Sequence, residues 1–165
     1  ALPICKAGGV VRVGSHAELS AAVAKLFATE FSGERPRCVL VEPWLDIARE
    51  LYLSVVVDGR AEGYCVLYGA RGGVDIESGA PPARYPVGPA ERFRLHELRA
   101  VLADAESDNE VRERVAALAQ RLVRVAASFD CTTLEINPLA RCADGRLVAA
   151  DAKVDRKSTR LNSNH

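Results

Sequence analysis

The chain has 165 residues, of which about half are apolar, so it can bury the core of one domain or of two small lobes. Lys and Arg total 22, as do Asp and Glu, and this balance argues against a general nucleic-acid-binding protein, which would carry a basic excess. No apolar run approaches the roughly 20 residues of a membrane span, and no signal peptide is recognisable.

The five cysteines do not form a recognisable site. Their number is odd, they are scattered along the chain, and no two are spaced as C-x-x-C, so a zinc site is not expected. We interpret them as reduced thiols, mostly buried: Cys5, Cys38, Cys65, Cys131 and Cys142.

The first elements are a short strand and a helix. Val10 to Val13 is apolar and β-branched, which favours a strand. Ser15 followed by Glu18 has the pattern of a capping box, and apolar residues then recur at helical spacing to about Phe31. A turn is expected over 33–36.

Strands dominate the next stretch. Cys38 to Val41 is apolar enough for a buried strand, and Leu51 to Asp58 is rich in valine. The Asp58-Gly59 turn signal predicts an antiparallel return over Tyr64 to Tyr68. Glycine and proline pairs predict a loop over 69–90.

The last third predicts two helices and a hairpin. The helices are expected at 91–105 and 109–128. The second has an apolar stripe made of Val111, Val115, Leu118, Leu122 and Val125. A strand over 132–139, a turn at 143–145 and a strand over 147–152 follow. The order of elements predicts an α+β fold with a mainly antiparallel sheet and packed helices.

The register of the final hairpin places two polar side chains opposite each other. If Gly145 takes the left-handed position of a three-residue loop, Cys142 faces Arg146. Counting back along both strands then sets Asn137 opposite Asp151. Directly opposed residues have Cβ atoms about 4.5–5.5 Å apart.

An amide oxygen and a carboxylate that converge in this way suit Mg²⁺, which takes few protein ligands when substrate phosphates complete its octahedron. Glu135 lies two residues before Asn137 and therefore on the same face of the strand. From spacing alone there is an alternative, in which Asn137-Pro138 ends a strand and Asp151 caps the edge of the sheet.

The segment T-L-E-I-N-P-L, followed by D-G and then by L-V-A-A-D-A-K, resembles the signature of the β subunits of succinyl-CoA and malyl-CoA type synthetases. The resemblance implies a partial ATP-grasp fold. It also implies that Asn137 and Asp151 bind the Mg²⁺ that accompanies ATP or GTP, with Glu135 contributing through water.

A second block, Leu40 to Glu42 followed by Asp46 to Ser54, is similar to the V-E…D-I-A-K-E-L-Y-L-S segment of the same family. The resemblance implies that Glu42 and the backbone near Leu45 line the base pocket and that Glu50 lies near the ribose. Without it, Glu50 is equally well read as a solvated charge.

Two further blocks agree in order and spacing. Arg71 to Glu77 is similar to the family's G-G-[MV]-[DE]-I-E, in which a Gly-Gly loop brings backbone close to phosphate, and Lys6 to Val10 is similar to G-K-A-G-G-V. The family places glycines where this chain has Leu2 to Cys5, and a phosphate-binding lysine upstream of that stretch.

The resemblance therefore predicts an internal fragment of a longer ligase. We expect residues 1–36 to be a remnant of the first ATP-grasp lobe, 37–155 the second lobe with the nucleotide and Mg²⁺ hairpin, and 156–165 a disordered or foreign tail. By itself the chain is expected to be inactive.

The implied reaction converts a carboxylic acid, CoA and ATP or GTP to acyl-CoA, ADP or GDP, and phosphate. The implied partner is an α subunit that binds CoA and bears the phosphorylated histidine, so none of the three histidines here takes that role. No nucleic acid or membrane partner is expected. The location would be the cytoplasm, or the mitochondrial matrix in a eukaryote.

Two alternatives stay open at this point. One is a different ATP-grasp ligase, forming citryl-CoA or joining a carboxylate to an amine, which would share the Mg²⁺ hairpin. The other is a truncated, non-catalytic binding module.

Overall fold

The computed structural model describes residues 8–73 and 81–157. The chain divides into two compact units, residues 1–45 and residues 46–165, which are taken separately below. The division falls later in the chain than the lobe boundary predicted after residue 36. Within the described ranges, no helix combines the length and the apolar character needed to cross a membrane.

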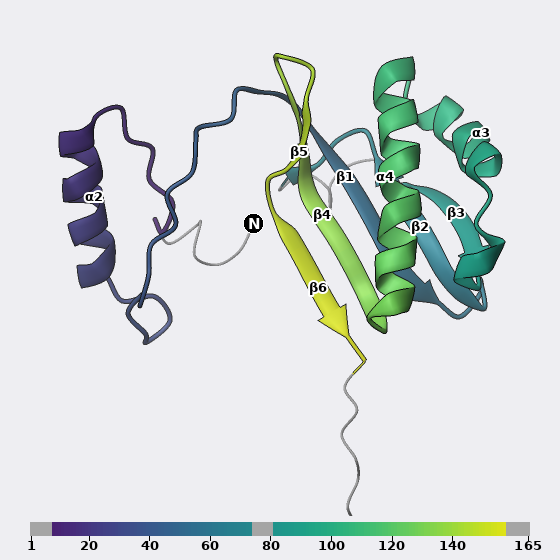
Figure 1. The fold of residues 1–165 in the computed structure, drawn as a ribbon, viewed down its shortest axis with the longest axis horizontal. Helices are drawn as coiled ribbons and strands as arrows, with labels where there is room; N and C mark the ends of the chain where they lie inside the picture. The colour runs from purple at the N-terminus through teal and green to yellow at the C-terminus, as the bar shows by residue number, and fades with distance from the viewer. Residues whose placement is uncertain (1–7, 74–80, 158–165) are drawn as a thin grey trace, which may run out of the picture. The chain divides into compact units, whose positions relative to one another are not determined.

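In its described residues, 8–45, the first unit has helix α2 (His16–Ala28) (Figure 1). Ser15 is its N-cap, as predicted: the Ser15 hydroxyl oxygen accepts from the Glu18 N–H at 3.2 Å. The Glu18 carboxylate in turn accepts from the Gly14 N–H at 2.8 Å. The helix ends before the predicted Phe31 because Thr29 is already extended and Phe31 pairs with Glu34 across a turn.

Two predicted strands of the first unit are wrong. Neither 10–13 nor 38–41 is a strand, and Val10, Leu40 and Val41 are more than half exposed. The cause is the absence of a partner: a strand needs a neighbour to satisfy its backbone groups, and no described segment of this unit pairs with either stretch.

Over residues 46–73 and 81–157, the second unit is a six-stranded antiparallel sheet with helices α3 and α4 (Figure 1). The sheet order is β3-β2-β1-β4-β5, and β6 also pairs with β4. The predicted α+β class is confirmed. The elements in chain order are β1 (Ile47–Asp58), β2 (Gly63–Gly69), β3 (Ala83–Gly88), η2 (Ala90–Arg92), α3 (Leu95–Ala105), α4 (Asn109–Ser128), β4 (Cys131–Cys142), β5 (Leu147–Ala149) and β6 (Ala152–Arg156).

Several boundaries differ from the prediction. The loop predicted over 69–90 contains strand β3, which tolerates Pro86 because β3 is an edge strand, where a missing N–H costs least. The helix predicted over 91–105 is split into η2 and α3. The last strand is split into β5 and β6, and β6 includes Arg156, the first residue of the predicted tail. Residues 158–165 lie outside the described residues.

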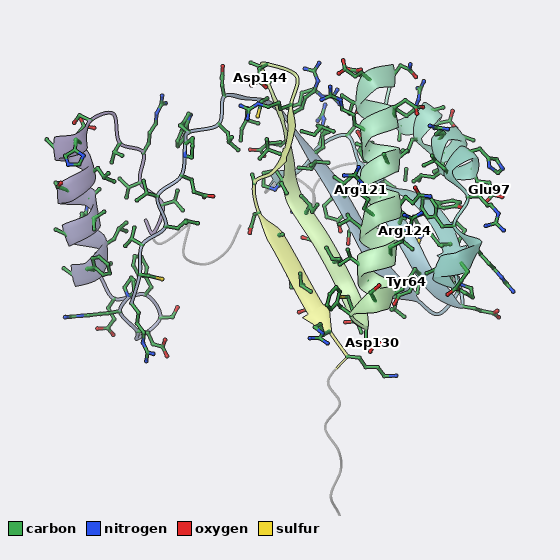
Figure 2. All side chains as sticks on the ribbon, viewed as in Figure 1. Tyr64, Glu97, Arg121, Arg124, Asp130 and Asp144 are labelled. Carbon is green, nitrogen blue, oxygen red and sulfur yellow. The ribbon has the colours of Figure 1, made fainter. Side chains whose placement is uncertain are left out.

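The core lies between the sheet and the two helices. Leu51, Leu53 and Val55 of β1 and Leu102 of α3 are at most 1% exposed. Helix α4 contributes the predicted stripe, with the correction that Val125 is exposed and Ala119 and Ala126 are buried. Figure 2 labels Arg121 and Arg124, which lie on α4. It also labels Asp144, which lies at the tip of the hairpin that joins β4 to β5.

A buried carboxylate connects the sheet to the segment between α3 and α4. Glu106 is 2% exposed and accepts two hydrogen bonds from Arg49 of β1, at 2.8 and 3.2 Å. It also accepts from the Tyr68 hydroxyl of β2 and from the Asp108 N–H. Burial alone would raise the pKa of Glu106, but the hydrogen bonds from Arg49 and Tyr68 outweigh it and hold that pKa below its usual value.

Candidate functional site

The sheet has a polar face on the side away from the core. Because strand residues alternate, Glu50, Tyr52 and Ser54 of β1 point away from the face that carries Leu51 and Leu53. Ser54 is paired with Glu135 of β4, which sets Glu135 on the same polar face. Three polar side chains of the central strand therefore share a surface with Glu135 of β4.

Tyr52 and Glu135 are joined across the two strands. The Tyr52 hydroxyl donates to the Glu135 carboxylate at 3.3 Å. Burial raises the pKa of Tyr52, and the nearby Glu135 carboxylate raises it further, so the phenol keeps its proton and remains a donor. This contact was not expected from the sequence.

The predicted hairpin register is confirmed. Gly145 has a φ of +85°, and the Cys142 N–H donates to the Arg146 carbonyl at 2.9 Å. Further along, the Asn137 N–H donates to the Asp151 carbonyl at 3.1 Å, so these two residues are opposite each other. Both side chains are half-buried, at the interruption between β5 and β6. The Asn137–Pro138 peptide bond is cis.

The Gly72-Gly73 pair lies against Asn137. The Gly73 N–H donates to the Asn137 Oδ1 at 2.7 Å, and the Asn137 Nδ2 donates to the Gly73 carbonyl at 3.5 Å. The Gly72 N–H donates to the Glu50 carbonyl at 2.7 Å. The Gly-Gly block that the sequence associates with phosphate thus lies against Asn137, while its remainder, 74–77, is outside the described residues.

The structure brings together only some of the predicted binding residues. Glu50, Asn137 and Asp151 belong to the second unit, where Glu50 is exposed and its carboxylate lies against Gly73. Glu42 and Leu45 belong to the first unit, where Glu42 is exposed and Leu45 is half-buried. Their assignment to the base pocket stays a prediction.

The donor set of the hairpin is compatible with Mg²⁺. Within residues 8–73 and 81–157, no three His, Cys, Asp or Glu side chains are grouped to hold a metal. Asn137 and Asp151 instead supply an amide oxygen and a carboxylate, and the Asp151 carboxylate has no hydrogen bond or ion pair in the described part of the chain. Mg²⁺ is held by one or two such groups when phosphates and water complete its shell.

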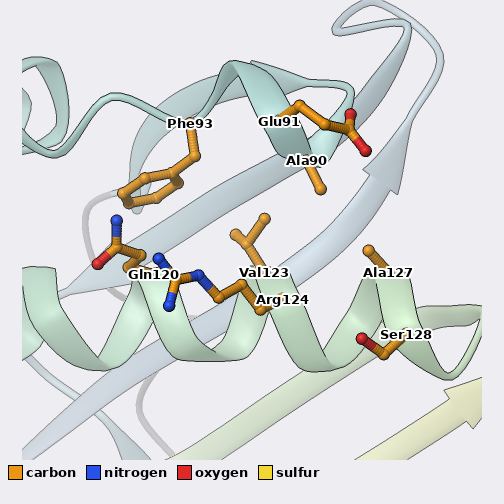
Figure 3. A pocket seen from close by; sticks show the side chains of 8 residues that line it. All are labelled: Ala90, Glu91, Phe93, Gln120, Val123, Arg124, Ala127 and Ser128. Atoms are coloured by element: carbon orange, nitrogen blue, oxygen red, sulfur yellow. The ribbon is translucent and has the colours of Figure 1, made fainter.

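Two cavities lie away from this site. A cavity of about 350 Å³ opens between η2 and α4, where Phe93, Val123 and Arg124 are among its lining residues (Figure 3). A second, of about 250 Å³, is lined by Asp58, Cys65 and neighbours at the far end of β1. Neither contains a predicted site residue, so the candidate site lies outside both cavities.

Comparison with known proteins decides the family. A model of the ATP-grasp domain matches residues 5–141. The chain belongs to the ATP-grasp family. The ATP-grasp fold and the family resemblance predicted from the motifs are therefore confirmed.

This ATP-grasp chain is similar to β subunits of ADP-forming succinate–CoA ligase. It is 31% identical to the one from Methanocaldococcus jannaschii over 152 residues, covering 89% of the chain and 42% of the relative. It is 35% identical to the one from Halobacterium salinarum over 153 residues, covering 89% and 40%. The chain thus spans less than half the length of these relatives.

Solved structures agree on the fold. An acetyl-coenzyme A synthetase from Ca. Korarchaeum cryptofilum, solved with coenzyme A and Mg-AMPPCP, matches with a TM-score of 0.67 and 15% identity, over 93% of this chain and 70% of that one. ATP citrate lyase from Methanothrix soehngenii, solved with citrate and coenzyme A, matches with a TM-score of 0.61 and 18% identity, over 84% and 32%.

Proposed function

We propose that the chain binds a Mg²⁺–nucleotide, ATP or GTP, as the nucleotide-binding part of an ADP- or GDP-forming acid–CoA ligase. The observation that carries the proposal is the pairing of Asn137 with Asp151 on neighbouring strands, in a chain of ATP-grasp sequence. The donor types and the polar side chains on the same face of the sheet support it.

Each proposed role is assigned to a named side chain. Asn137 Oδ1 and the Asp151 carboxylate would hold the cation, which when bound neutralises charge on the phosphate oxygens. Glu135, fixed by Tyr52, would contribute through water. Glu50 would lie near the ribose, and Glu42 with the backbone near Leu45 would line the base pocket.

The reaction of the whole protein is proposed from the relatives. It would join a carboxylic acid to CoA with hydrolysis of ATP or GTP, and an α subunit would bind CoA and carry the phosphohistidine. The β subunits at 31% and 35% identity favour a succinate–CoA ligase type over the citrate enzyme, whose likeness at 18% identity is one of fold. The chain alone is expected to bind nucleotide without turnover.

Titration calorimetry of Mg-ADP and Mg-ATP into the chain tests the proposal. An Asn137→Ala/Asp151→Ala variant should lose more than about 100-fold in Mg²⁺-dependent affinity, because ligands matter at least as much as the outer-shell partners whose loss costs about 10–100-fold. Asp155→Ala is the matched control: Asp155 is an exposed carboxylate on β6 that is paired with Lys153, and its removal should leave binding unchanged.

Circular dichroism establishes that both variants remain folded. If the unsubstituted chain shows no Mg²⁺-dependent binding, or if a folded Asn137→Ala/Asp151→Ala variant binds as well as the control, the proposed function is wrong.

A further inference from the structure

The side-chain amide of Asn137 forms hydrogen bonds with the backbone N–H and the backbone carbonyl of one residue, Gly73. Its oxygen accepts from the Gly73 N–H at 2.7 Å, and its nitrogen donates to the Gly73 carbonyl at 3.5 Å. Both ends of the amide are thus matched to one residue that lies 64 positions away in the sequence. The shorter contact is a full hydrogen bond, and the longer one is at the limit of hydrogen-bond distance.

The position of Gly73 is tightly constrained by its neighbours. Gly73 has a φ of +75°, which disfavours any side chain, and a Cβ there would overlap the Glu50 carboxylate. Gly72 is buried, and a Cβ on it would overlap the Leu51 carbonyl group, lying 2.6 Å from the carbonyl carbon. The backbone of the Gly72-Gly73 turn therefore packs directly against the start of β1. This position brings Gly73 within hydrogen-bond distance of Asn137.

The contact has a consequence for cation binding because the two ends of an amide are not equivalent. The oxygen is an acceptor with two lone pairs, whereas the nitrogen is a donor that repels a cation. In the observed orientation one lone pair of Oδ1 accepts the hydrogen bond from the Gly73 N–H, and the other lone pair is available to a further partner. If the amide turned over, two N–H donors would face each other and two oxygens would face each other.

We propose that Gly73 is a positioning residue for Asn137: its backbone N–H and carbonyl orient the amide so that Oδ1 is presented to the cation of the bound nucleotide. The inference rests on the function proposed above. Gly73 acts through Asn137, so the Gly72-Gly73 turn should control the Mg²⁺-dependent part of nucleotide affinity and leave the Mg²⁺-independent part unchanged.

Gly73→Ala tests the proposal, because alanine is strained at a φ of +75° and should move the Gly73 N–H and carbonyl away from Asn137. Calorimetry should show about a 10–100-fold loss of affinity for Mg-ADP, the range found when a partner that orients a metal ligand is lost. The affinity for ADP in EDTA should fall by a much smaller factor, since the metal plays no part there and only the shift of Glu50 away from the added Cβ can act. A structural defect, or displacement of Glu50 alone, would lower both affinities by the same factor.

The matched control is Gly33→Ala. Gly33 lies in the turn between Phe31 and Glu34 and has a φ of +87°, so alanine meets a similar backbone strain there, but it has no atom within 4 Å of an added Cβ. This variant should bind Mg-ADP and metal-free ADP as the unsubstituted chain does.

A second measurement needs neither metal nor nucleotide. Amide hydrogen exchange of Gly73, followed by NMR, should be about tenfold faster in Asn137→Ala than in the unsubstituted chain, because a lost hydrogen bond opens that site locally. Unchanged exchange, or unchanged Mg-ADP affinity in Gly73→Ala, overturns the inference alone. If the unsubstituted chain has no Mg²⁺-dependent binding, the proposed function and this inference both fall.

Discussion

Replacing Glu106 by alanine is expected to lower the free energy of unfolding by about 3–5 kcal/mol, the range found when one member of a buried ion pair is removed. Arg49 and Tyr68 would both lose their shared acceptor, and the segment between α3 and α4 would lose its attachment to β1 and β2. The free energy of unfolding of small domains is only about 5–15 kcal/mol, so this single change would remove a large part of it.

Urea unfolding followed by circular dichroism measures the effect. Glu113→Ala is the control, because Glu113 also pairs with an arginine, at 2.6 Å from Arg99, but at the surface. Exposed pairs contribute about 0–1 kcal/mol, so that variant should remain close to the unsubstituted chain. Equal decreases in the free energy of unfolding in the two variants would show that the buried Glu106 cluster contributes no more to stability than an exposed ion pair.

The pH dependence of the free energy of unfolding gives an independent test of the role of Glu106. The folded-state pKa of Glu106 is lowered, so its stabilisation is present above the unfolded pKa, about 4.3 for glutamate, and is lost as the pH falls through the folded pKa. The cost of Glu106→Gln should therefore be largest near neutral pH and should shrink in acid, where the native carboxyl is itself protonated.

The hairpin at the end of the chain could be predicted because its determinants are local. A glycine in the left-handed position fixes the turn, and the turn fixes the register that sets Asn137 opposite Asp151. The long helix α4 was predicted from Asn109 to Ser128 for a similar reason, since its apolar period extends over many turns.

Features that depend on distant partners were missed. The apolar stretches at 10–13 and 38–41 have strand propensity but no paired neighbour, so propensity alone gave the wrong answer. Strand β3 was missed because Pro86 was weighed without knowing that it lies at an edge. Glu106 stands in an acidic run that resembles a solvated loop, and only the fold brings Arg49 and Tyr68 to it.

The candidate site shows the same division. The motif placed Asn137 and Asp151 together, and it identified the Gly-Gly pair as a point of close backbone approach. What that backbone approaches could not be read from the sequence, because Gly73 and Asn137 meet only after β1, β2 and β4 are assembled into one sheet.

Gly72→Ala is expected to damage the site more than Gly73→Ala. An alanine Cβ would overlap the Leu51 carbonyl group, which belongs to the backbone of the central strand and cannot move aside as a side chain can. Overpacking of this kind costs about 1–3 kcal/mol or more, and the hydrogen bond from the Gly72 N–H to the Glu50 carbonyl would add about 1 kcal/mol if it broke. The Gly72-Gly73 turn should therefore move away from β1, and Gly73 should move away from Asn137 with it.

The expected result is a loss of Mg-ADP affinity of at least about 100-fold, together with rapid hydrogen exchange at Gly73 while the amides in the centre of β1 and β2 keep their protection. Gly59→Ala is the control, because Gly59 lies in the turn after β1 and has nothing within 4 Å of an added Cβ. If Gly72→Ala bound Mg-ADP as tightly as Gly59→Ala, the turn would be dispensable. Asn137 and Asp151 would then have to hold the cation without the support that Gly72 and Gly73 give them.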